Sequence, residues 1–151
     1  MPSKLLFLPG ATGSTEFWRP AATLIGHPAE KTFVGWPGIG STPAEEGTTG
    51  TQDFVSRVVA QIDQPTALVA QSMGGVIAIL AACQRPQLVT HLVLAALSGG
   101  IDMSGLDVRD WRPPKHEMTG ELRYAFASYS ENLETQLKSL KVELLLLSSS
   151  Q

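Results

Sequence analysis

The feature that most constrains the fold is an alternation of short apolar runs with longer stretches of helical character. The apolar runs predict five strands, at residues 5–8, 31–35, 66–70, 91–97 and 142–147. Helices are expected at residues 15–25, where Pro20 marks the start or a kink, and at 52–63 and 73–84. Strands that alternate with helices require crossover connections, which give a mostly parallel sheet covered on both faces. The sequence therefore predicts an α/β protein.

One connection is much longer than a crossover requires. Residues 98–141 separate the fourth and fifth predicted strands, whereas a crossover needs about a dozen residues or more. Residues 102–114 are rich in Asp, Pro and Gly, and 121–140 have helical character. Insertions at the carboxyl end of a strand usually build over a ligand site. We therefore expect 98–141 to form a small lid within a single domain that spans residues 1–151.

Composition excludes several classes of protein. With 151 residues, of which 43% are hydrophobic, the chain can form one core, so it is neither disordered nor fibrous. A net charge of -3 argues against nucleic-acid binding. The longest apolar run, residues 76–83, is too short to cross a bilayer, and no apolar leader precedes the first strand. We expect a cytoplasmic protein with no membrane or nucleic-acid partner.

The strongest chemical motif is the sequence Ala-Gln-Ser-Met-Gly-Gly at residues 70–75, between a predicted strand and a predicted helix. A serine on such a turn is exposed at the carboxyl end of its strand, which predicts that Ser72 is a nucleophile. The turn needs small residues two places before and after the serine, and Ala70 and Gly74 meet this need. The helix that follows points its free N–H groups toward developing negative charge, so the Met73 N–H is the expected first oxyanion donor. The alternative is an ordinary strand–helix junction with a chance serine.

A glycine-rich loop, Pro-Gly-Ala-Thr-Gly at residues 9–13, follows the first strand. Ala11, helped by Thr12, could supply the second oxyanion N–H. The loop also has features of a phosphate-binding loop in nucleotide-dependent oxidoreductases. That fingerprint requires a further glycine where Glu16 stands, and an acidic residue where Gly35 and Trp36 end the second strand. An ordinary turn is the third interpretation.

Aromatic residues near these loops are candidates for a substrate pocket. Trp36 is expected mainly to fill a turn, and it could also form one wall of the pocket together with Thr12. In the predicted lid, further candidates are Trp111, Tyr124, Phe126 and Tyr129. Aromatic residues in such segments more often pack than recognise a ligand.

Taken together, these motifs resemble those of the α/β-hydrolase superfamily. The 9–11 loop, the Pro-Gly-Ile-Gly-Ser turn at 37–41 and the Ser72 turn occur in the order typical of these enzymes, and the five predicted strands correspond to the third to seventh strands of that fold. The resemblance implies a triad in the order serine, acid, histidine, in which the histidine takes the serine's proton and the acid orients it. The acid usually follows the seventh strand and the histidine the eighth. This sequence ends at Gln151, so it is expected to lack both.

The three histidines present are the candidates for the missing general base. His27 and His91 are expected at the amino end of the sheet, opposite Ser72, whereas His116 in the lid could reach the site. Asp102 occupies a place that some relatives use for the acid, and it is equally suited to a turn. The histidines lack metal-ligand spacing, and no cofactor is implied.

Three functions remain open on the sequence alone. The first is a serine hydrolase for a small ester or related acyl substrate, inactive or nearly so without the missing acid and histidine. The second is a non-catalytic or incomplete hydrolase-like protein, and the third is a nucleotide-binding oxidoreductase. The last strand, residues 142–147, is expected to leave an unpaired edge that could mediate self-association.

Overall fold

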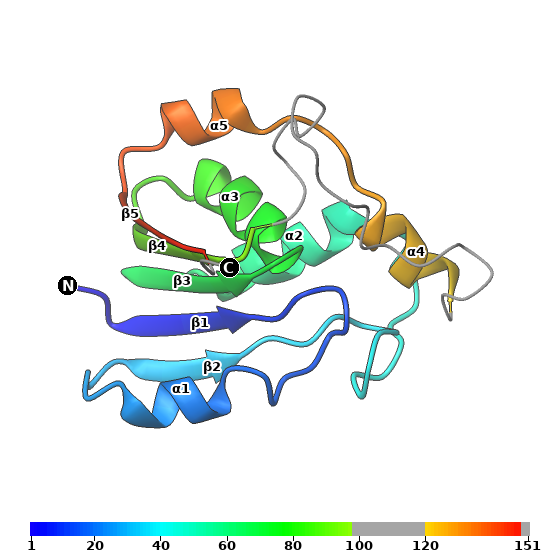
Figure 1. Ribbon diagram of the computed structural model, residues 1–151, viewed down its shortest axis with the longest axis horizontal. Helices are drawn as coiled ribbons and strands as arrows, with labels where there is room; N and C mark the ends of the chain where they lie inside the picture. The colour runs from blue at the N-terminus through cyan, green and yellow to red at the C-terminus, as the bar shows by residue number, and fades with distance from the viewer. Residues whose placement is uncertain (98–119, 149–151) are drawn as a thin grey trace.

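The computed structural model describes residues 1–97 and 120–148 (Figure 1). Its centre is a five-stranded sheet with the order β2-β1-β3-β4-β5, and every neighbouring pair is parallel. The strands are β1 (Lys4–Leu8), β2 (Glu30–Phe33), β3 (Thr66–Gln71), β4 (Val89–Ala95) and β5 (Glu143–Leu147). All five predicted strands are present, and the α/β prediction is confirmed.

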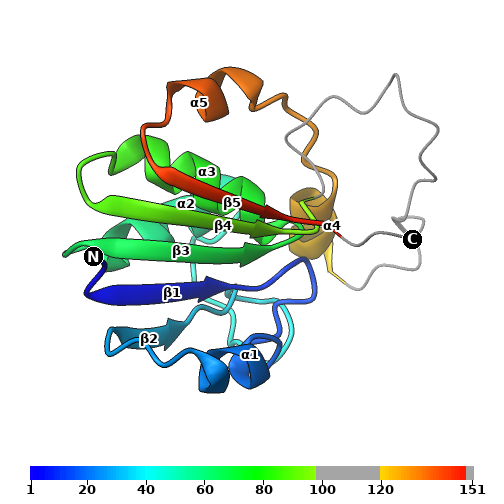
Figure 2. The same cartoon turned by 60° about the vertical axis from the view of Figure 1, so that its left-hand side comes forward.

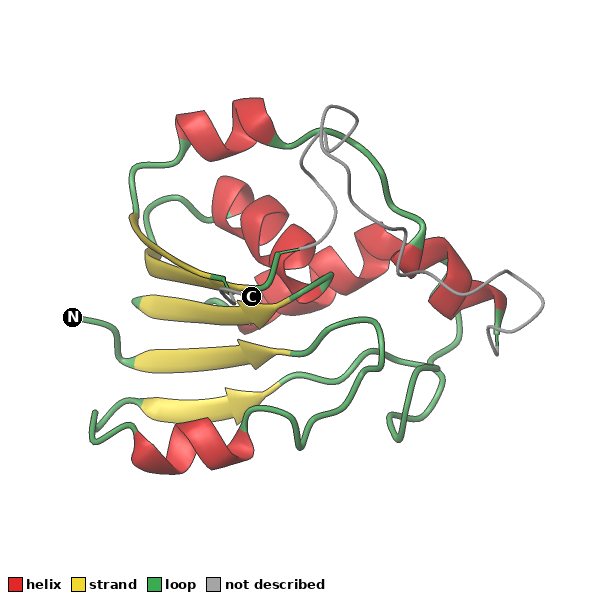
Figure 3. Ribbon diagram, viewed as in Figure 1, coloured by secondary structure: helices red, strands yellow, loops and turns green. Residues whose placement is uncertain are grey.

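Helices cover the sheet on both faces (Figure 3). They are α1 (Arg19–Leu24), α2 (Thr51–Gln61), α3 (Gly74–Gln84), α4 (Glu121–Ala127) and α5 (Glu134–Ser139). Helix α1 lies on one face, while α2 and α3 pack together on the other, and α5 packs against α3. Pro20 occupies the first turn of α1, where a missing N–H costs nothing, so the helix begins at Arg19 as that proline predicts.

Side-chain alternation along the inner strands builds a separate core on each face. In β1, Leu6 and Leu8 belong to the large core beneath α2 and α3, while Leu5 and Phe7 belong to the smaller core beneath α1. The helix α3 is buried almost all round, from Gly74 to Ala82. Burial on both faces explains why the sequence of β1 and β3 is continuously apolar rather than alternating.

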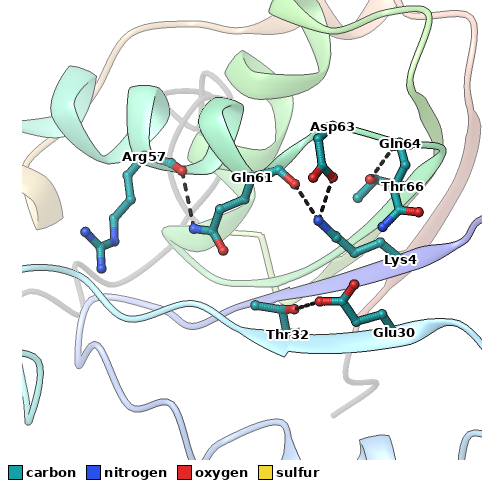
Figure 4. Close-up of polar contacts among 8 residues, drawn as sticks. All are labelled: Lys4, Glu30, Thr32, Arg57, Gln61, Asp63, Gln64 and Thr66. Carbon is teal, nitrogen blue, oxygen red and sulfur yellow. Dashed lines mark hydrogen bonds and ion pairs between the residues drawn. The ribbon is translucent and has the colours of Figure 1, made fainter.

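The amino ends of the strands are tied to α2 by a buried lysine (Figure 4). The Lys4 ammonium donates hydrogen bonds to the Gln61 carbonyl at 3.1 Å and to Asp63 Oδ1 at 2.6 Å. The hydrogen bond from Lys4 lowers the pKa of the Asp63 carboxyl below its usual value. These contacts close the helix–strand connection at the end of the sheet opposite Ser72.

The helical character expected at residues 121–140 is present as two separate helices, α4 and α5. Residues 128–133 separate α4 from α5, and Asn132 Oδ1 accepts a hydrogen bond from the Glu134 N–H at 2.8 Å. Asn and Ser side chains compete with the helix for backbone groups, which explains the interruption. Helix α4 lies beyond the carboxyl ends of the strands, as two views agree (Figures 1 and 2). The remainder of the predicted lid, residues 98–119, lies outside the described residues.

The last strand is the most exposed part of the sheet. β5 pairs with β4 from His91↔Glu143 to Ala95↔Leu147, and across residues 1–97 and 120–148 no strand pairs with its other edge. Leu145 is 52% exposed and Leu146 62% exposed. No helix in the described ranges is long and apolar enough to span a membrane.

Candidate functional site

Ser72 occupies a sharp turn between β3 and α3. Its backbone has φ 52°, a left-handed conformation that is uncommon for a residue other than glycine. The Ser72 N–H donates to the Ala95 carbonyl at 2.9 Å, and the Ser72 carbonyl accepts from the Gly75 N–H at 2.9 Å. These bonds hold the strained backbone in place, and the side chain is half-buried at the carboxyl end of the sheet. Strain of this kind persists where the surrounding structure determines it, and it concentrates at functional sites.

The two residues expected to be small each have a steric reason to be so. Ala70 is fully buried in the large core. A Cβ placed on Gly74 would lie 2.3 Å from the Pro9 carbonyl oxygen and 3.0 Å from that of Leu8. The first turn of α3 therefore packs directly against the backbone that leaves β1, which is a contact that only glycine permits.

The loop at residues 9–13 lies against Ser72. A Cβ on Gly10 would lie 3.2 Å from Ser72 Cβ and 2.6 Å from Gln71 Oε1. Both predicted oxyanion donors are adjacent to this contact, since Ala11 follows Gly10 and Met73 follows Ser72. Among the described residues, neither the Ala11 nor the Met73 N–H donates to a backbone carbonyl, so both groups are available to another acceptor.

Trp36 packs in the core and holds this loop. Its side chain is fully buried, and its Nε1–H donates to the Gly10 carbonyl at 3.0 Å. The ring packs against Phe54 at 5.2 Å and Phe126 at 5.6 Å between centroids. Trp36 and Phe126 expose no surface and belong to the core, which agrees with the packing role expected mainly of Trp36. An aromatic residue after a strand gives the same sequence pattern in either role.

Tyr129, another predicted wall residue, is half-buried and donates from its hydroxyl to Glu131 Oε2 at 2.9 Å. Burial, with the neighbouring Glu131, raises the pKa of Tyr129 to about 12. Tyr129 is therefore neutral at physiological pH. Tyr124 is half-buried in α4.

A cavity of about 450 Å³ lies beside the 9–13 loop. Its lining comes from three segments and consists of Thr12, Gly38, Ile39, Gly40, Gly120 and Arg123. Thr12 was expected at a pocket wall and lies at this one. Arg123 was not anticipated, because a single arginine in a predicted helix is usually a solvated surface residue.

The histidines seen in the structure lie away from Ser72. His27 is in the connection before the amino end of β2, where its Nδ1 accepts from the Ala29 N–H at 3.1 Å. His91 pairs with Ala67 and Glu143 near the amino ends of their strands, and its Nε2 lies 3.6 Å from Glu143 Oε2. The remaining predicted site residues, Asp102, Trp111 and His116, lie outside the described residues.

Cys83 offers no competing nucleophile. It lies near the carboxyl end of α3, half-buried, with Sγ 4.0 Å from the Gln136 carbonyl. Burial raises the pKa of the Cys83 thiol above its usual value, which disfavours the reactive thiolate. Within the described ranges, no three His, Cys, Asp or Glu side chains are grouped in a way that could hold a metal ion.

Comparisons with known proteins place this arrangement in a family. A family model described as "Alpha/beta hydrolase family" matches residues 5–142, so the chain belongs to the alpha/beta hydrolase family. Among solved structures, the type II thioesterase BorB from the borrelidin biosynthetic cluster is similar to this chain. The likeness has a TM-score of 0.64 and 17% sequence identity, and it covers 100% of this chain and 85% of BorB. A search of curated proteins gives no match.

Proposed function

We propose that the chain is a serine hydrolase that acts on a small ester, thioester or related acyl substrate, with Ser72 as the nucleophile. The observation that carries the proposal is the left-handed backbone of Ser72 at a tight turn between a buried strand and a helix, in a member of the alpha/beta hydrolase family. Such a turn presents a serine hydroxyl to substrate at the edge of the sheet.

In the proposed reaction, Ser72 Oγ gives its proton to a base and attacks the acyl carbonyl carbon, and the alcohol or thiol leaves with a proton to give an acyl-enzyme. Water then hydrolyses the acyl-enzyme to a carboxylic acid and free Ser72. The carbonyl oxygen gains negative charge as the bond forms. The Ala11 and Met73 N–H groups, which lie on either side of the Gly10–Ser72 contact, are the proposed donors to this oxygen. The amino-terminal end of α3, which begins at Gly74, adds its positive dipole end to the same region.

The general base is the weak point of the proposed site. Both histidines in the described part of the chain lie toward the amino ends of the strands, and Ser72 lies at the carboxyl ends. A serine hydroxyl without a base stays protonated and reacts slowly. We therefore propose that these 151 residues have little esterase activity unless His116, with Asp102 as a candidate acid, supplies the base.

The test is hydrolysis of p-nitrophenyl butyrate and of a butyryl thioester. A thioester is included because the similar structure is that of a thioesterase. Added imidazole replaces a missing histidine base, so we expect it to accelerate release of the leaving group by the wild-type chain. Ser72→Ala should remove the acceleration. Ser56→Ala, an exposed serine on α2, is the matched control and should leave it unchanged.

The response of the wild type and of Ser72→Ala to imidazole determines whether Ser72 is the nucleophile. If Ser72→Ala responds to imidazole as the wild type does, Ser72 is not the nucleophile and the proposed function is wrong. If the wild type is fast without imidazole, a base is present in the chain, and His116→Ala identifies whether it is that histidine. In a complete triad, loss of the serine lowers turnover by about 10⁶.

A further inference from the structure

The pocket that contains Arg123 has no part in the mechanism above. It lies at the Ser72 end of the sheet, because Thr12 is two residues beyond Gly10, which contacts the serine, and α4 lies beyond the carboxyl ends of the strands. Ser72 and the pocket therefore lie at the same end of the sheet.

Close contacts at two glycines shape the walls of this pocket. A Cβ on Gly40, where φ is 61°, would lie 2.7 Å from the Thr12 carbonyl oxygen. A Cβ on Gly38, where φ is 78°, would lie 3.3 Å from Leu122 Cδ2. The loop after β2 thus packs against the 10–13 loop on one side and α4 on the other. The contact with the 10–13 loop is to backbone, the Thr12 carbonyl, and the contact with α4 is to the Leu122 side chain.

Arg123 lines this pocket, and its charge has no partner among the described residues. Its side chain is half-buried, and its Nε is a buried donor without a hydrogen-bond partner. Arg57 also has an unpartnered Nε, but its Nη1 is paired with Glu45, and Arg19 is paired with Glu16. In the part of the chain that the structure describes, no carboxylate pairs with Arg123. A partly buried guanidinium remains charged, and such groups are normally paired.

We propose that Arg123 binds an anionic oxygen group of the substrate, a carboxylate or a phosphate, at a distance from the reacting carbonyl. The planar guanidinium presents parallel N–H donors that match either group. This inference rests on the proposed function, since it names the class of acyl substrate that Ser72 would attack. The lining glycines and Ile39 add no competing charge.

The test is an NMR titration of the wild-type chain with three esters of matched length. Monomethyl glutarate carries a carboxylate, methyl 4-phosphonobutyrate carries a phosphonate, and dimethyl glutarate is neutral. We expect at least one anionic ester to bind about tenfold to a hundredfold more tightly than the neutral one, as a charge-assisted hydrogen bond implies. The stronger of the two anionic esters identifies the preferred anion.

Variants then assign the preference to Arg123. Arg123→Gln should bind all three esters with similar, weak affinity, whereas Arg123→Lys should keep part of the anionic preference. Arg85→Gln is the matched control, since Arg85 is exposed at the end of α3, and it should keep the full preference. Equal binding of the three esters by the wild type, or a preference that survives Arg123→Gln, would overturn the inference.

Failure of the inference is separable from failure of the proposed function. Covalent labelling of wild-type Ser72 with an uncharged fluorophosphonate, measured in the presence of imidazole, reports on the nucleophile alone. Labelling of Ser72 without a preference for anionic esters overturns the role of Arg123 and leaves the proposed serine hydrolase function intact. Anionic preference without labelling supports the binding site and overturns the nucleophile.

Discussion

The close contact between Gly74 and the Pro9 carbonyl oxygen, next to Ser72, makes Gly74→Ala a direct test of the structure. Alanine is favoured over glycine inside a helix by about 1 kcal/mol, so propensity alone predicts that the variant is more stable. The new Cβ would lie 2.3 Å from the Pro9 carbonyl oxygen, however, and must move to at least 3.0 Å. The obstacle is backbone, so α3 or the strand end has to shift. Overpacking costs about 1–3 kcal/mol, and a backbone obstacle belongs in the upper part of this range, about 2–3 kcal/mol. After the gain in helix propensity, the net loss is about 1–2 kcal/mol.

The neighbouring glycine supplies a matched control in the same helix. A Cβ on Gly75 would lie 2.5 Å from Leu97 Cδ1, the end of a flexible side chain that can change its rotamer at a cost of about 1 kcal/mol. The gain in helix propensity offsets this cost, so Gly75→Ala should be close to neutral. Urea denaturation followed by circular dichroism gives both free energies of unfolding. A Gly74→Ala variant as stable as the wild type would refute the proposed packing of α3 on the Pro9 backbone.

Two further predictions concern the loop beside Ser72 and the edge of the sheet. Trp36→Phe keeps the aromatic packing but removes the hydrogen bond to the buried Gly10 carbonyl. The free energy of unfolding, measured by urea denaturation, should therefore fall by about 1–2 kcal/mol. An unchanged value would mean that this hydrogen bond does not hold the loop. We also propose that the exposed edge of β5 mediates self-association at micromolar to millimolar concentration, and that Leu145→Lys shifts the chain to monomer in analytical ultracentrifugation. A wild-type chain that stays monomeric would contradict the second prediction.

The strands could be predicted from the sequence because local chemistry determines them. The runs in β1 and β3 are buried on both faces, so they are continuously apolar and are bounded by residues that cannot extend them. The need for a small residue at position 74 could also be predicted, since a strand–turn–helix junction leaves no space two residues after the serine. The structure identifies the neighbour that imposes this need as the backbone of Pro9.

The pocket could not be predicted in the same way. Trp36, Phe54 and Phe126 come from distant parts of the chain and form one buried aromatic cluster, which no local pattern distinguishes from a pocket wall. Arg123 has the sequence context of an ordinary surface arginine on a helix. Its significance depends on the absence of a partner and on the loop that faces it, and both are properties of the tertiary structure.

The most direct test of the central claim is the intact mass of the chain after reaction with a fluorophosphonate, measured over time with and without imidazole. The account predicts a single adduct that maps to Ser72, forms slowly alone and faster as imidazole is added, and is absent from Ser72→Ala. An adduct that forms equally on Ser72→Ala, or no adduct on the wild type even with imidazole, would contradict the claim that Ser72 is a nucleophile.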